Sequence, residues 1–256
     1  MHRFYLPPES CIGSVLQLDE REAHHALHVL RVKRGEPVIV LDGDGHELFC
    51  EVANSSRKDV ALRVKQKSVV PPPSCQITLL QAIPRGKIIE SIIQKSVELG
   101  AHCIVPLLTG RVATRLGEKD AASKQEKWQL VAVEAIKQCG AAWLPKIEPP
   151  MAPAQFFARK EKFDLSLVGS LQTDRRHPRE CFQEFQSKHG RPPQRVAVWI
   201  GPEGDFTSEE LKVIQTAGAL PISLGRLVLR VETAAIYCLS ILNYELNQAL
   251  KNGRDA

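Results

Sequence analysis

The stretch Leu224–Ala235, LGRLVLRVETAA, holds the residue types best suited to chemistry on a bound ligand. Gly225 has no Cβ, so a ligand can approach its backbone closely. Arg230 follows the apolar run 227–229, which we expect to be buried, and its guanidinium can stabilise negative charge that develops on a substrate. Glu232 is a candidate general base, or alternatively a partner for the free N–H groups of the next helix. The stretch therefore predicts a site at the start of a helix.

The helix that follows this stretch runs to Leu246 and is apolar on nearly every side in its first half. Thr233 stands, with Glu232, where the first N–H groups of that helix need partners. A helix with apolar residues all round is buried, either in a core or against another subunit. We therefore predict a homodimer that forms through this helix.

Glycine follows each of three short apolar runs that are typical of buried parallel strands. The three junctions are 168–169, 200–205 (IGPEGD) and 224–225. Ligands in open parallel sheets bind outside the carboxyl ends of the strands, so we expect one pocket walled by backbone N–H and C=O groups. Such a pocket can bind the edge of an adenine, and Glu203 would add a second candidate base. Alternatively, each glycine only makes a turn.

From residue 76 onward, apolar strand patterns alternate with helical ones. The expected elements before residue 140 cover 76–83, 86–99, 103–108 and 128–139. A further helix begins at Ser208, where Thr207 can act as the N-cap and Glu210 can close a capping box. This alternation predicts an α/β fold built on a parallel sheet.

Residues 1–70 carry short alternating runs interrupted by one helix, which predicts a small β domain. Asp42-Gly43-Asp44-Gly45 lies between two such runs and indicates a hairpin turn. Three consecutive prolines follow at 71–73, and prolines in a row favour a stiff, extended linker. We therefore predict a β domain at 1–70, a linker at 71–75 and an α/β domain at 76–256.

The helix expected at 20–30 carries three histidines and leads into a basic cluster. His24 and His28 are one helical turn apart and could share a metal ion, but no third ligand follows at a recognised spacing, so we predict no metal. The basic residues expected to contact nucleic-acid phosphates are Arg3, Arg31, Lys33 and Arg34. The alternative is an ordinary solvated run of charge.

Composition and missing motifs exclude several protein classes. No apolar run approaches the roughly 20 residues of a membrane span, and the first residues lack a signal-peptide core. Seven cysteines stand singly without a CxxC motif, which is typical of reduced thiols in a cytoplasmic protein. The net charge of +5 favours an anionic partner. A P-loop, a dinucleotide-binding GxGxxG and a serine nucleophile elbow are all missing.

The motifs at 200–205 and 224–235 resemble the two signature loops of the SPOUT RNA methyltransferases. More narrowly, the chain resembles the RsmE family, which methylates N3 of a uridine in the 16S ribosomal RNA of the small ribosomal subunit. Further matches are QKSVELG at 94–100, VP at 105–106, EA at 134–135, KQ at 137–138, and HVLR at 28–31 followed by Gly35.

The resemblance implies a SPOUT-type parallel sheet with a C-terminal trefoil knot, which holds S-adenosyl-L-methionine at a homodimer interface. The resemblance also implies a PUA-like β-barrel, which precedes this sheet in the chain and binds RNA. The implied cofactor contacts are Ile200, Gly201, Pro202, Glu203, Gly204, Leu224, Gly225, Leu227, Leu229, Arg230, Thr233 and Ala234. Lys87, Lys95 and Arg111 join the candidate RNA contacts, and Gln138 joins Arg230, Glu232 and Glu203 as a candidate catalytic residue.

Methylation at uracil N3 requires loss of the N3 proton, which places negative charge on O2 and O4. Arg230 is the leading candidate to stabilise that charge, with Arg111 and Gln138 behind it. The candidate bases are Glu203, Asp205, Glu134 and Glu232. The sequence does not choose among these carboxylates, and positioning of the substrate alone is a further option.

Three positions depart from the family pattern. Asp205 stands where relatives have a second glycine, Leu227 directly follows Arg226, and Ala141 replaces a common arginine. Two other classes of protein therefore stay open. One is an enzyme that methylates a ribose 2′-hydroxyl or another RNA, and the other is a catalytically silent ribosome-assembly factor.

Overall fold

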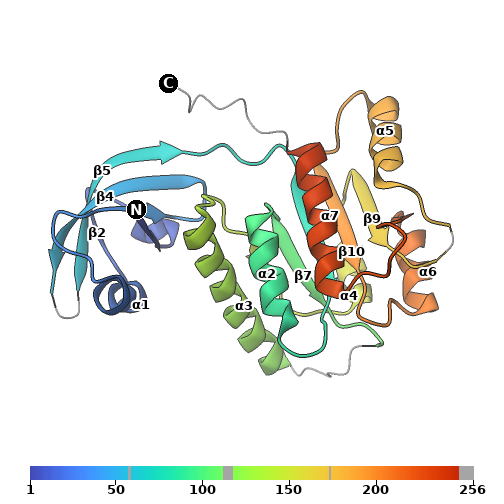
Figure 1. Ribbon diagram of the computed structural model, residues 1–256, viewed down its shortest axis with the longest axis horizontal. Helices are drawn as coiled ribbons and strands as arrows, with labels where there is room; N and C mark the ends of the chain where they lie inside the picture. Colours follow the sequence, from blue (N-terminus) through green and yellow to red (C-terminus); the bar gives the residue numbers. More distant parts are fainter. Residues whose placement is uncertain (57–58, 112–117, 173, 248–256) are drawn as a thin grey trace. The chain divides into compact units, whose positions relative to one another are not determined.

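The computed structural model describes residues 1–56, 59–111, 118–172 and 174–247 of the chain (Figure 1). The chain forms two compact units, each with its own sheet. The first unit consists of Met1–Pro72 together with Val133–Leu144. The second consists of Pro73–Ala132 together with Pro145–Ala256. The chain passes from one unit to the other within the run of three prolines.

The first unit contains a five-stranded sheet in the order β1-β3-β4-β5-β2. Its strands are β1 (His2–Tyr5), β2 (Val15–Gln17), β3 (Pro37–Leu41), β4 (His46–Ser55) and β5 (Val60–Val69). The predicted hairpin joins β3 and β4, which pair antiparallel. The Asp42 carboxylate accepts the backbone N–H groups of Asp44 at 2.8 Å and His46 at 3.0 Å, and these bonds fix the turn. The predicted β fold of the N-terminal part is confirmed, whereas the bounds 1–70 stay a prediction.

A helical segment lies between β2 and β3, as the sequence predicts. It begins as α1 (Glu20–His24), where the Asp19 side chain accepts the N–H of Glu22 at 2.7 Å, and continues as a π-helix, η2 (His25–Leu30). Arg31 ends the segment in the left-handed conformation, with φ 55°. The extent of the predicted helix is therefore confirmed, although its second half has the wider π geometry.

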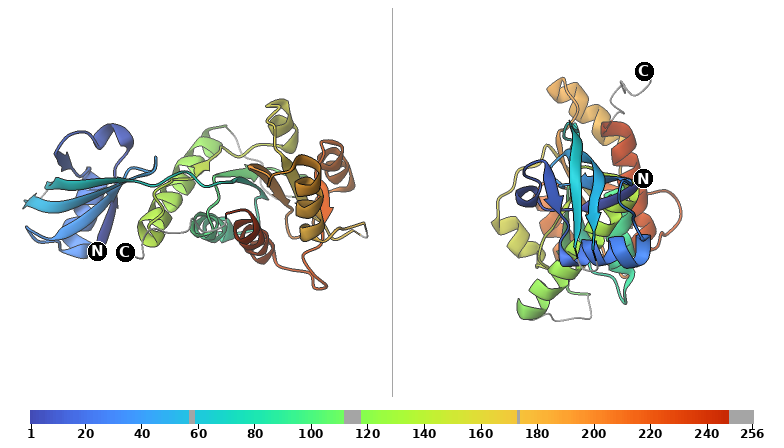
Figure 2. Two further views of the ribbon diagram at one scale, coloured as in Figure 1. Left: turned by 90° about the horizontal axis from the view of Figure 1, so that it is seen from above. Right: turned by 90° about the vertical axis from the view of Figure 1, so that its left-hand side faces the viewer.

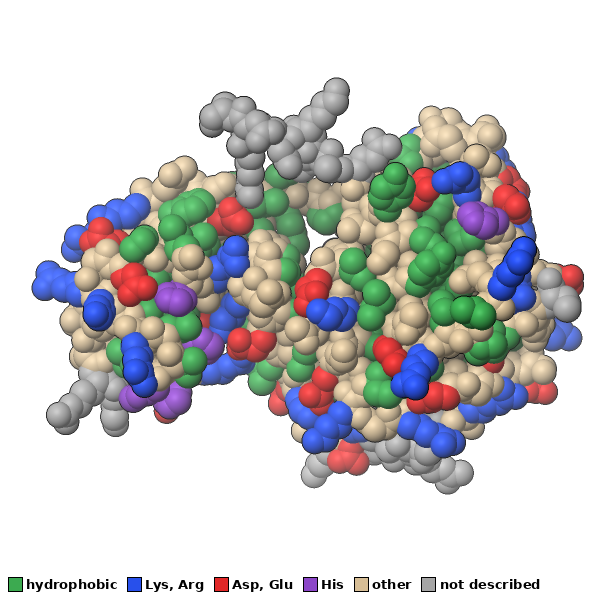
Figure 3. Space-filling view, viewed as in Figure 1, with side chains coloured by type: hydrophobic (Ala, Val, Ile, Leu, Met, Phe, Trp, Pro, Cys, Tyr) green, Lys and Arg blue, Asp and Glu red, His purple; other side chains and the backbone are tan. Residues whose placement is uncertain are grey.

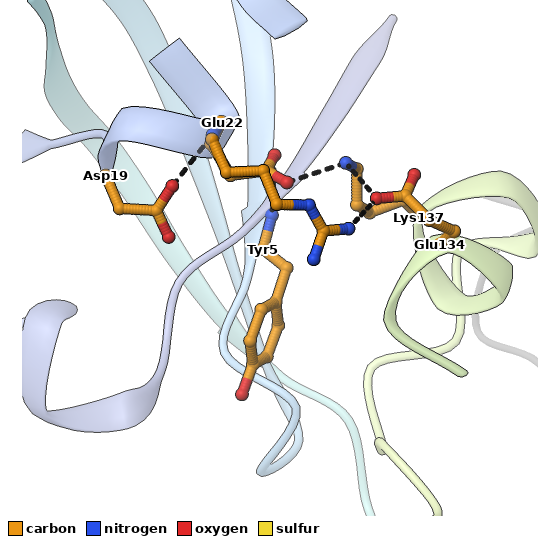
Figure 4. Close-up of polar contacts among 6 residues, drawn as sticks. Tyr5, Asp19, Glu22, Glu134 and Lys137 are labelled. Carbon is orange, nitrogen blue, oxygen red and sulfur yellow. Dashed lines mark hydrogen bonds and ion pairs between the residues drawn. The ribbon is translucent and has the colours of Figure 1, made fainter. Parts of the chain in front are cut away.

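A buried ion pair joins α1 to the last turns of α3 (Glu118–Cys139) within the first unit (Figure 4). Nζ of Lys137 lies 2.7 Å from the Glu22 carboxylate and 3.2 Å from that of Glu134. Arg21 also contacts Glu134, and the Tyr5 N–H donates to Glu22 at 3.4 Å. Burial opposes ionisation of Glu134, but Lys137 and Arg21 together hold its pKa below the usual value. Glu134 is thus a structural carboxylate and a poor general base.

The second unit contains a six-stranded sheet in the order β11-β9-β10-β6-β7-β8. Its strands are β6 (Gln76–Ala82), β7 (Cys103–Leu107), β8 (Lys146–Ile147), β9 (Leu165–Gly169), β10 (Arg195–Ile200) and β11 (Leu220–Ile222). All neighbouring strands are parallel, so the predicted sheet is confirmed. The third apolar run was expected to stay a strand up to the junction at 224–225, but β11 ends at Ile222, two residues earlier, because the Ser223 hydroxyl turns the chain by accepting the Gly225 N–H at 3.3 Å. The trefoil knot stays a prediction.

Helices cover both faces of this sheet (Figure 2). They are α2 (Ile88–Glu98), α4 (Pro153–Ala158), α5 (Pro178–His189), α6 (Ser208–Thr216), α7 (Val231–Leu246) and the first part of α3. On one face, Trp199 of β10 packs with Phe156 of α4 and Ile214 of α6. On the other, Val198 of β10 lies with Leu242 of α7. Successive side chains of β10 therefore pack against helices on opposite faces of the sheet. The predicted capping box at Thr207 and Glu210 is confirmed.

Candidate functional site

One cavity of about 440 Å³ lies at the carboxyl ends of β9, β10 and β11. Gly169, Gly201 and Gly225, the three glycines that follow the apolar runs in the sequence, all line it. They meet there because β9 pairs with both β10 and β11 in parallel. The strand order thus assembles one pocket from three segments that are spread over more than 50 residues of sequence.

Ten of the twelve residues expected to bind a cofactor line this cavity. They are Ile200, Gly201, Pro202, Glu203, Leu224, Gly225, Leu227, Leu229, Arg230 and Ala234. Gly204 and Thr233 are next to lining residues but do not line the cavity themselves. The structure adds Ile88, Leu171 and Arg175, which no sequence motif indicated. They come from the start of α2 and the loop after β9, whose positions depend on the tertiary fold.

The loop after β10 has a tight turn that accounts for the unusual Asp205. Asp205 adopts the left-handed conformation, with φ 63°, where glycine is the usual residue. Its carboxylate accepts the N–H of Phe206 at 2.8 Å, and aspartate tolerates this conformation better than most residues. A Cβ on Gly201 would lie 3.0 Å from that carboxylate and 3.1 Å from the Phe206 nitrogen. The loop therefore needs glycine at 201 but accommodates aspartate at 205.

Two neighbouring loops are fastened to this turn. The Glu203 carboxylate accepts the backbone N–H of Arg85, before α2, at 2.9 Å. The Arg111 guanidinium donates to the carbonyl oxygen of Gly204, and the Gly110 N–H donates to the Glu210 carboxylate at 2.7 Å. Glu203 was predicted to transfer a proton and Arg111 to contact RNA. In the structure both side chains hold neighbouring loops together beside the cavity.

The segment before α7 differs from its predicted environment. Leu227 and Val228 are 79% and 77% exposed, so the expectation that the run 227–229 is buried is wrong. The run follows β11 as a loop, so the sheet does not cover its side chains in the single chain. Arg230 is exposed at the N-cap of α7, and its carbonyl accepts the N–H of Ala234 at 2.8 Å.

Glu232 lies in the first turn of α7 and lines the cavity. The N-cap residue Arg230 makes no side-chain hydrogen bond to the first N–H groups of this helix, and the capping role of Glu232 and Thr233 stays a prediction. A carboxylate in the first turn is still favoured by the helix dipole. Arg230, Glu232 and Glu203 thus lie around one cavity, and their charges can act on a ligand inside it.

Gln138, the fourth candidate catalytic residue, belongs to the first unit. Its side chain is exposed, and its carbonyl accepts a guanidinium N–H of Arg3 at 3.1 Å. The same Arg3 nitrogen lies 3.4 Å from the carbonyl of Lys137. Arg3 therefore caps the C-terminus of α3, where a cation is favoured, rather than standing free for RNA.

The other candidate RNA contacts are divided between the two units. In the first, Arg31, Lys33 and Arg34 are exposed, and no carboxylate of the described residues lies within ion-pair distance of them. In the second, Lys87 is exposed at the N-cap of α2, whereas Lys95 pairs with Glu98 at 2.9 Å. The cluster at 31–34 keeps the most charge available for phosphates.

Metal and membrane sites are not found in the described parts of the chain. No group of three or more His, Cys, Asp or Glu side chains there could hold a metal ion. None of the helices described is both long and apolar enough to cross a membrane. All seven cysteines are free, and burial raises the pKa of the Cys238 thiol to about 12. The buried thiols are therefore protonated and unreactive at neutral pH.

Comparisons with known proteins agree with the fold. The RNA methyltransferase domain matches residues 71–243, and the RNA methyltransferase PUA domain matches residues 18–65. These matches define the class as an RNA methyltransferase with an N-terminal PUA domain. The ribosomal RNA small subunit methyltransferase E of Synechocystis is 30% identical over 94% of this chain and 77% of its own length. The chain belongs to the ribosomal RNA small subunit methyltransferase E family.

Two solved structures resemble the whole chain. A Legionella pneumophila protein, solved with the bound cofactor SAM, has a TM-score of 0.84 and 34% identity over 94% of this chain and 96% of its own. A ribosomal RNA small subunit methyltransferase E from Neisseria gonorrhoeae, bound to S-adenosyl methionine, has a TM-score of 0.82 and 26% identity. That match covers 95% of this chain and 97% of the other.

Proposed function

We propose that the protein transfers a methyl group from S-adenosyl-L-methionine to N3 of a uridine in the 16S rRNA of the small ribosomal subunit. The observation that carries this proposal is the cavity at three glycine-ended strands, in a chain that belongs to the methyltransferase E family. Its volume of about 440 Å³ is in the range of small-molecule sites. We further propose that the protein acts in the cytoplasm.

The lining fits this cofactor by chemistry as well as by size. Glycine backbones leave N–H and C=O groups available for the polar edge of an adenine, and Ile200, Leu224 and Leu229 provide apolar surface. The Glu203, Asp205 and Glu232 carboxylates complement the positive sulfonium and ammonium groups. When bound, the cofactor supplies an electrophilic methyl group.

In the proposed mechanism, the residues around the cavity act on the uracil ring. Arg230 is exposed at the cavity edge, so its guanidinium can donate to the uracil oxygen on which negative charge grows. Glu232 and Glu203 can each accept the N3 proton. Of the two, Glu203 already accepts the N–H of Arg85, which leaves Glu232 the less committed carboxylate. The target base would have to leave its stack to reach these groups.

The exposed cluster of Arg31, Lys33 and Arg34 in the PUA-like unit supports its proposed role in holding ribosomal RNA. Phosphate contacts of this kind provide affinity that does not depend on sequence. We propose that the trefoil knot orders the cofactor loops, as the family resemblance implies.

We also propose that two copies form a homodimer through α7. Tyr237 and Tyr244 on this helix are 45% and 81% exposed, and Leu227 and Val228 before it are exposed as well. Hydrophobic side chains gather on the surface around α7 (Figure 3). Light scattering should give twice the chain mass at micromolar concentration, and a monomer mass would contradict the dimer.

Nucleoside analysis of 16S rRNA tests the proposed reaction. Small subunits from cells that lack the gene should be missing one N3-methyluridine, and the purified protein with S-adenosyl-L-methionine should restore it. Appearance of a 2′-O-methyl nucleoside instead would favour a ribose methyltransferase. Binding to subunits without any methyl transfer would favour a silent assembly factor.

A further inference from the structure

Arg175 lines the cavity from the loop after β9, and no sequence motif indicated it. Its side chain is half-buried, and Nη1 donates to the carbonyl oxygen of Ser170 at 3.2 Å. Ser170 is only 5% exposed and follows Gly169, the last residue of β9. The hydrogen bond therefore holds the guanidinium against the strand end that borders the cavity.

The charge of Arg175 has no carboxylate partner among the described residues. Its neighbour Arg176 differs, because that guanidinium lies 2.6 Å from the carboxylate of Glu184. Arginine remains charged and has five N–H donors, of which Arg175 uses one for Ser170. A half-buried cation with unused donors is suited to a planar anion such as a carboxylate.

The cofactor proposed for this cavity carries one carboxylate, on its methionine part. Among the residues that the structure describes, Arg175 and Arg230 are the two arginines that line the cavity. Arg230 is exposed at the N-cap of α7, whereas Arg175 is half-buried and anchored at a strand end. Because an anchored guanidinium loses less freedom on binding, Arg175 is the better fixed receptor for the carboxylate.

We propose that Arg175 binds the carboxylate of the methionine part of S-adenosyl-L-methionine and makes the pocket selective for cofactors that retain this group. The inference rests on the proposed function, because it concerns the same cavity. It assigns Arg175 to cofactor recognition and leaves Arg230 free to face the RNA substrate.

Calorimetry with the full chain and two ligands tests this assignment. The ligands are S-adenosyl-L-methionine and its decarboxylated analogue, which keeps the adenosine, sulfonium and amine but lacks the carboxylate. Arg175→Met should raise the Kd of S-adenosyl-L-methionine at least about tenfold, which is about 1.4 kcal/mol. The same variant should change the Kd of the decarboxylated analogue less than about twofold.

Two variants serve as controls. Arg226 is exposed in the loop before α7 and does not line the cavity, so Arg226→Met should bind both ligands as the unaltered protein does. Arg230→Met asks whether the other lining arginine holds the carboxylate. Circular dichroism and thermal unfolding of each variant show whether the fold is retained.

The outcomes separate the inference from the proposed function. An equal loss for both ligands in a folded Arg175→Met protein would overturn the inference while leaving cofactor binding intact. A loss confined to S-adenosyl-L-methionine in Arg230→Met, but not in Arg175→Met, would also overturn it. If the unaltered protein binds neither ligand, the proposed function fails and the inference fails with it.

Discussion

Nζ of Lys137 lies 2.7 Å from Oε1 of Glu22, and the two side chains are only 6% and 3% exposed. The residues are 115 positions apart in sequence, so the pair joins α1 to the last turns of α3. Burial raises the pKa of Glu22, and the hydrogen bond from Lys137 opposes this rise. The pair therefore depends on both members being present.

Lys137→Met should destabilise the protein by about 3–5 kcal/mol, because it leaves the Glu22 carboxylate buried without a cation. Adding Glu22→Leu to that variant should recover most of the loss, since an apolar pair needs no charge compensation. Urea unfolding of the two variants and the unaltered protein gives the comparison. A double variant as unstable as Lys137→Met would show that the pair contributes through something other than charge.

Asp164 should make the stability depend on pH. Its carboxylate accepts from Arg191 at 2.9 Å and from the backbone of Gln194 at 2.8 Å. The Arg191 hydrogen bond is the leading cause that lowers the pKa of Asp164 from 3.8 to about 2. Since the folded-state pKa is below the unfolded one, this stabilisation is present above pH 3.8 and is lost as the pH falls toward 2.

Asp164→Asn provides the measurement for that pH dependence. Unfolding midpoints of the variant and the unaltered protein should differ at pH 6 and converge as the pH falls through the window set by Asp164. If the difference in unfolding midpoint stays constant as the pH falls from 3.8 to about 2, Asp164 is not the group that causes the pH dependence.

Asp205→Gly should keep the fold and cofactor binding, with stability within about 1 kcal/mol of the unaltered protein, because glycine adopts φ 63° without strain. Asp205→Val should be clearly less stable and bind cofactor more weakly, because a β-branched residue strains that conformation. Thermal unfolding and calorimetry measure the two effects. Equal behaviour of both variants would show that the turn does not depend on the left-handed conformation.

Arg230→Lys should transfer the methyl group at least about tenfold more slowly, which is about 1.4 kcal/mol of barrier. Lysine keeps the charge but loses the two-pronged geometry of the guanidinium. Because Arg230 is exposed, the variant should fold, dimerise and bind cofactor normally. Single-turnover transfer with saturating small subunits is the measurement, and an unchanged rate would remove Arg230 from the chemistry.

Replacing Arg31, Lys33 and Arg34 together with alanine should weaken binding to small subunits and flatten its dependence on salt, since fewer counterions are released. Cofactor affinity should not change. Substitution is preferable to deletion of residues 1–70, because that deletion would also remove the packing partners of Val133–Leu144. Equal salt dependence in the two proteins would show that the cluster does not contact phosphates.

Local patterns predicted much of this structure correctly. The apolar run before Gly201 and the capping signals at Thr207 and Glu210 depend on short stretches of chain, and both are confirmed. The prediction that Leu227 is buried was wrong, because an apolar side chain does not by itself show whether other parts of the same chain pack over it. The sequence did not indicate Arg175, because its hydrogen bond to the Ser170 carbonyl forms only when the loop after β9 has folded.

The Glu134 assignment shows the same limit for charged residues. As a lone carboxylate in a family motif, it qualified as a base. Only the fold brings Arg21 to its side chain, together with Lys137 from the next helical turn. Motifs thus identified which residues matter, whereas their roles depended on partners distant in sequence.

The pairing of β6 with β10 has a consequence for synthesis of the chain. Gln76 lies beside Arg195, so the partner of β6 is translated 119 residues later. At about 5–20 residues per second, this delay is roughly 6–24 s. During it, the edge of β6 that later pairs with β10 keeps its backbone N–H and C=O groups unpaired, in a strand whose Ile77 and Leu79 side chains are fully buried in the finished sheet. The nascent chain therefore presents an aggregation-prone strand edge, and chaperone depletion during translation should lower the yield of folded protein.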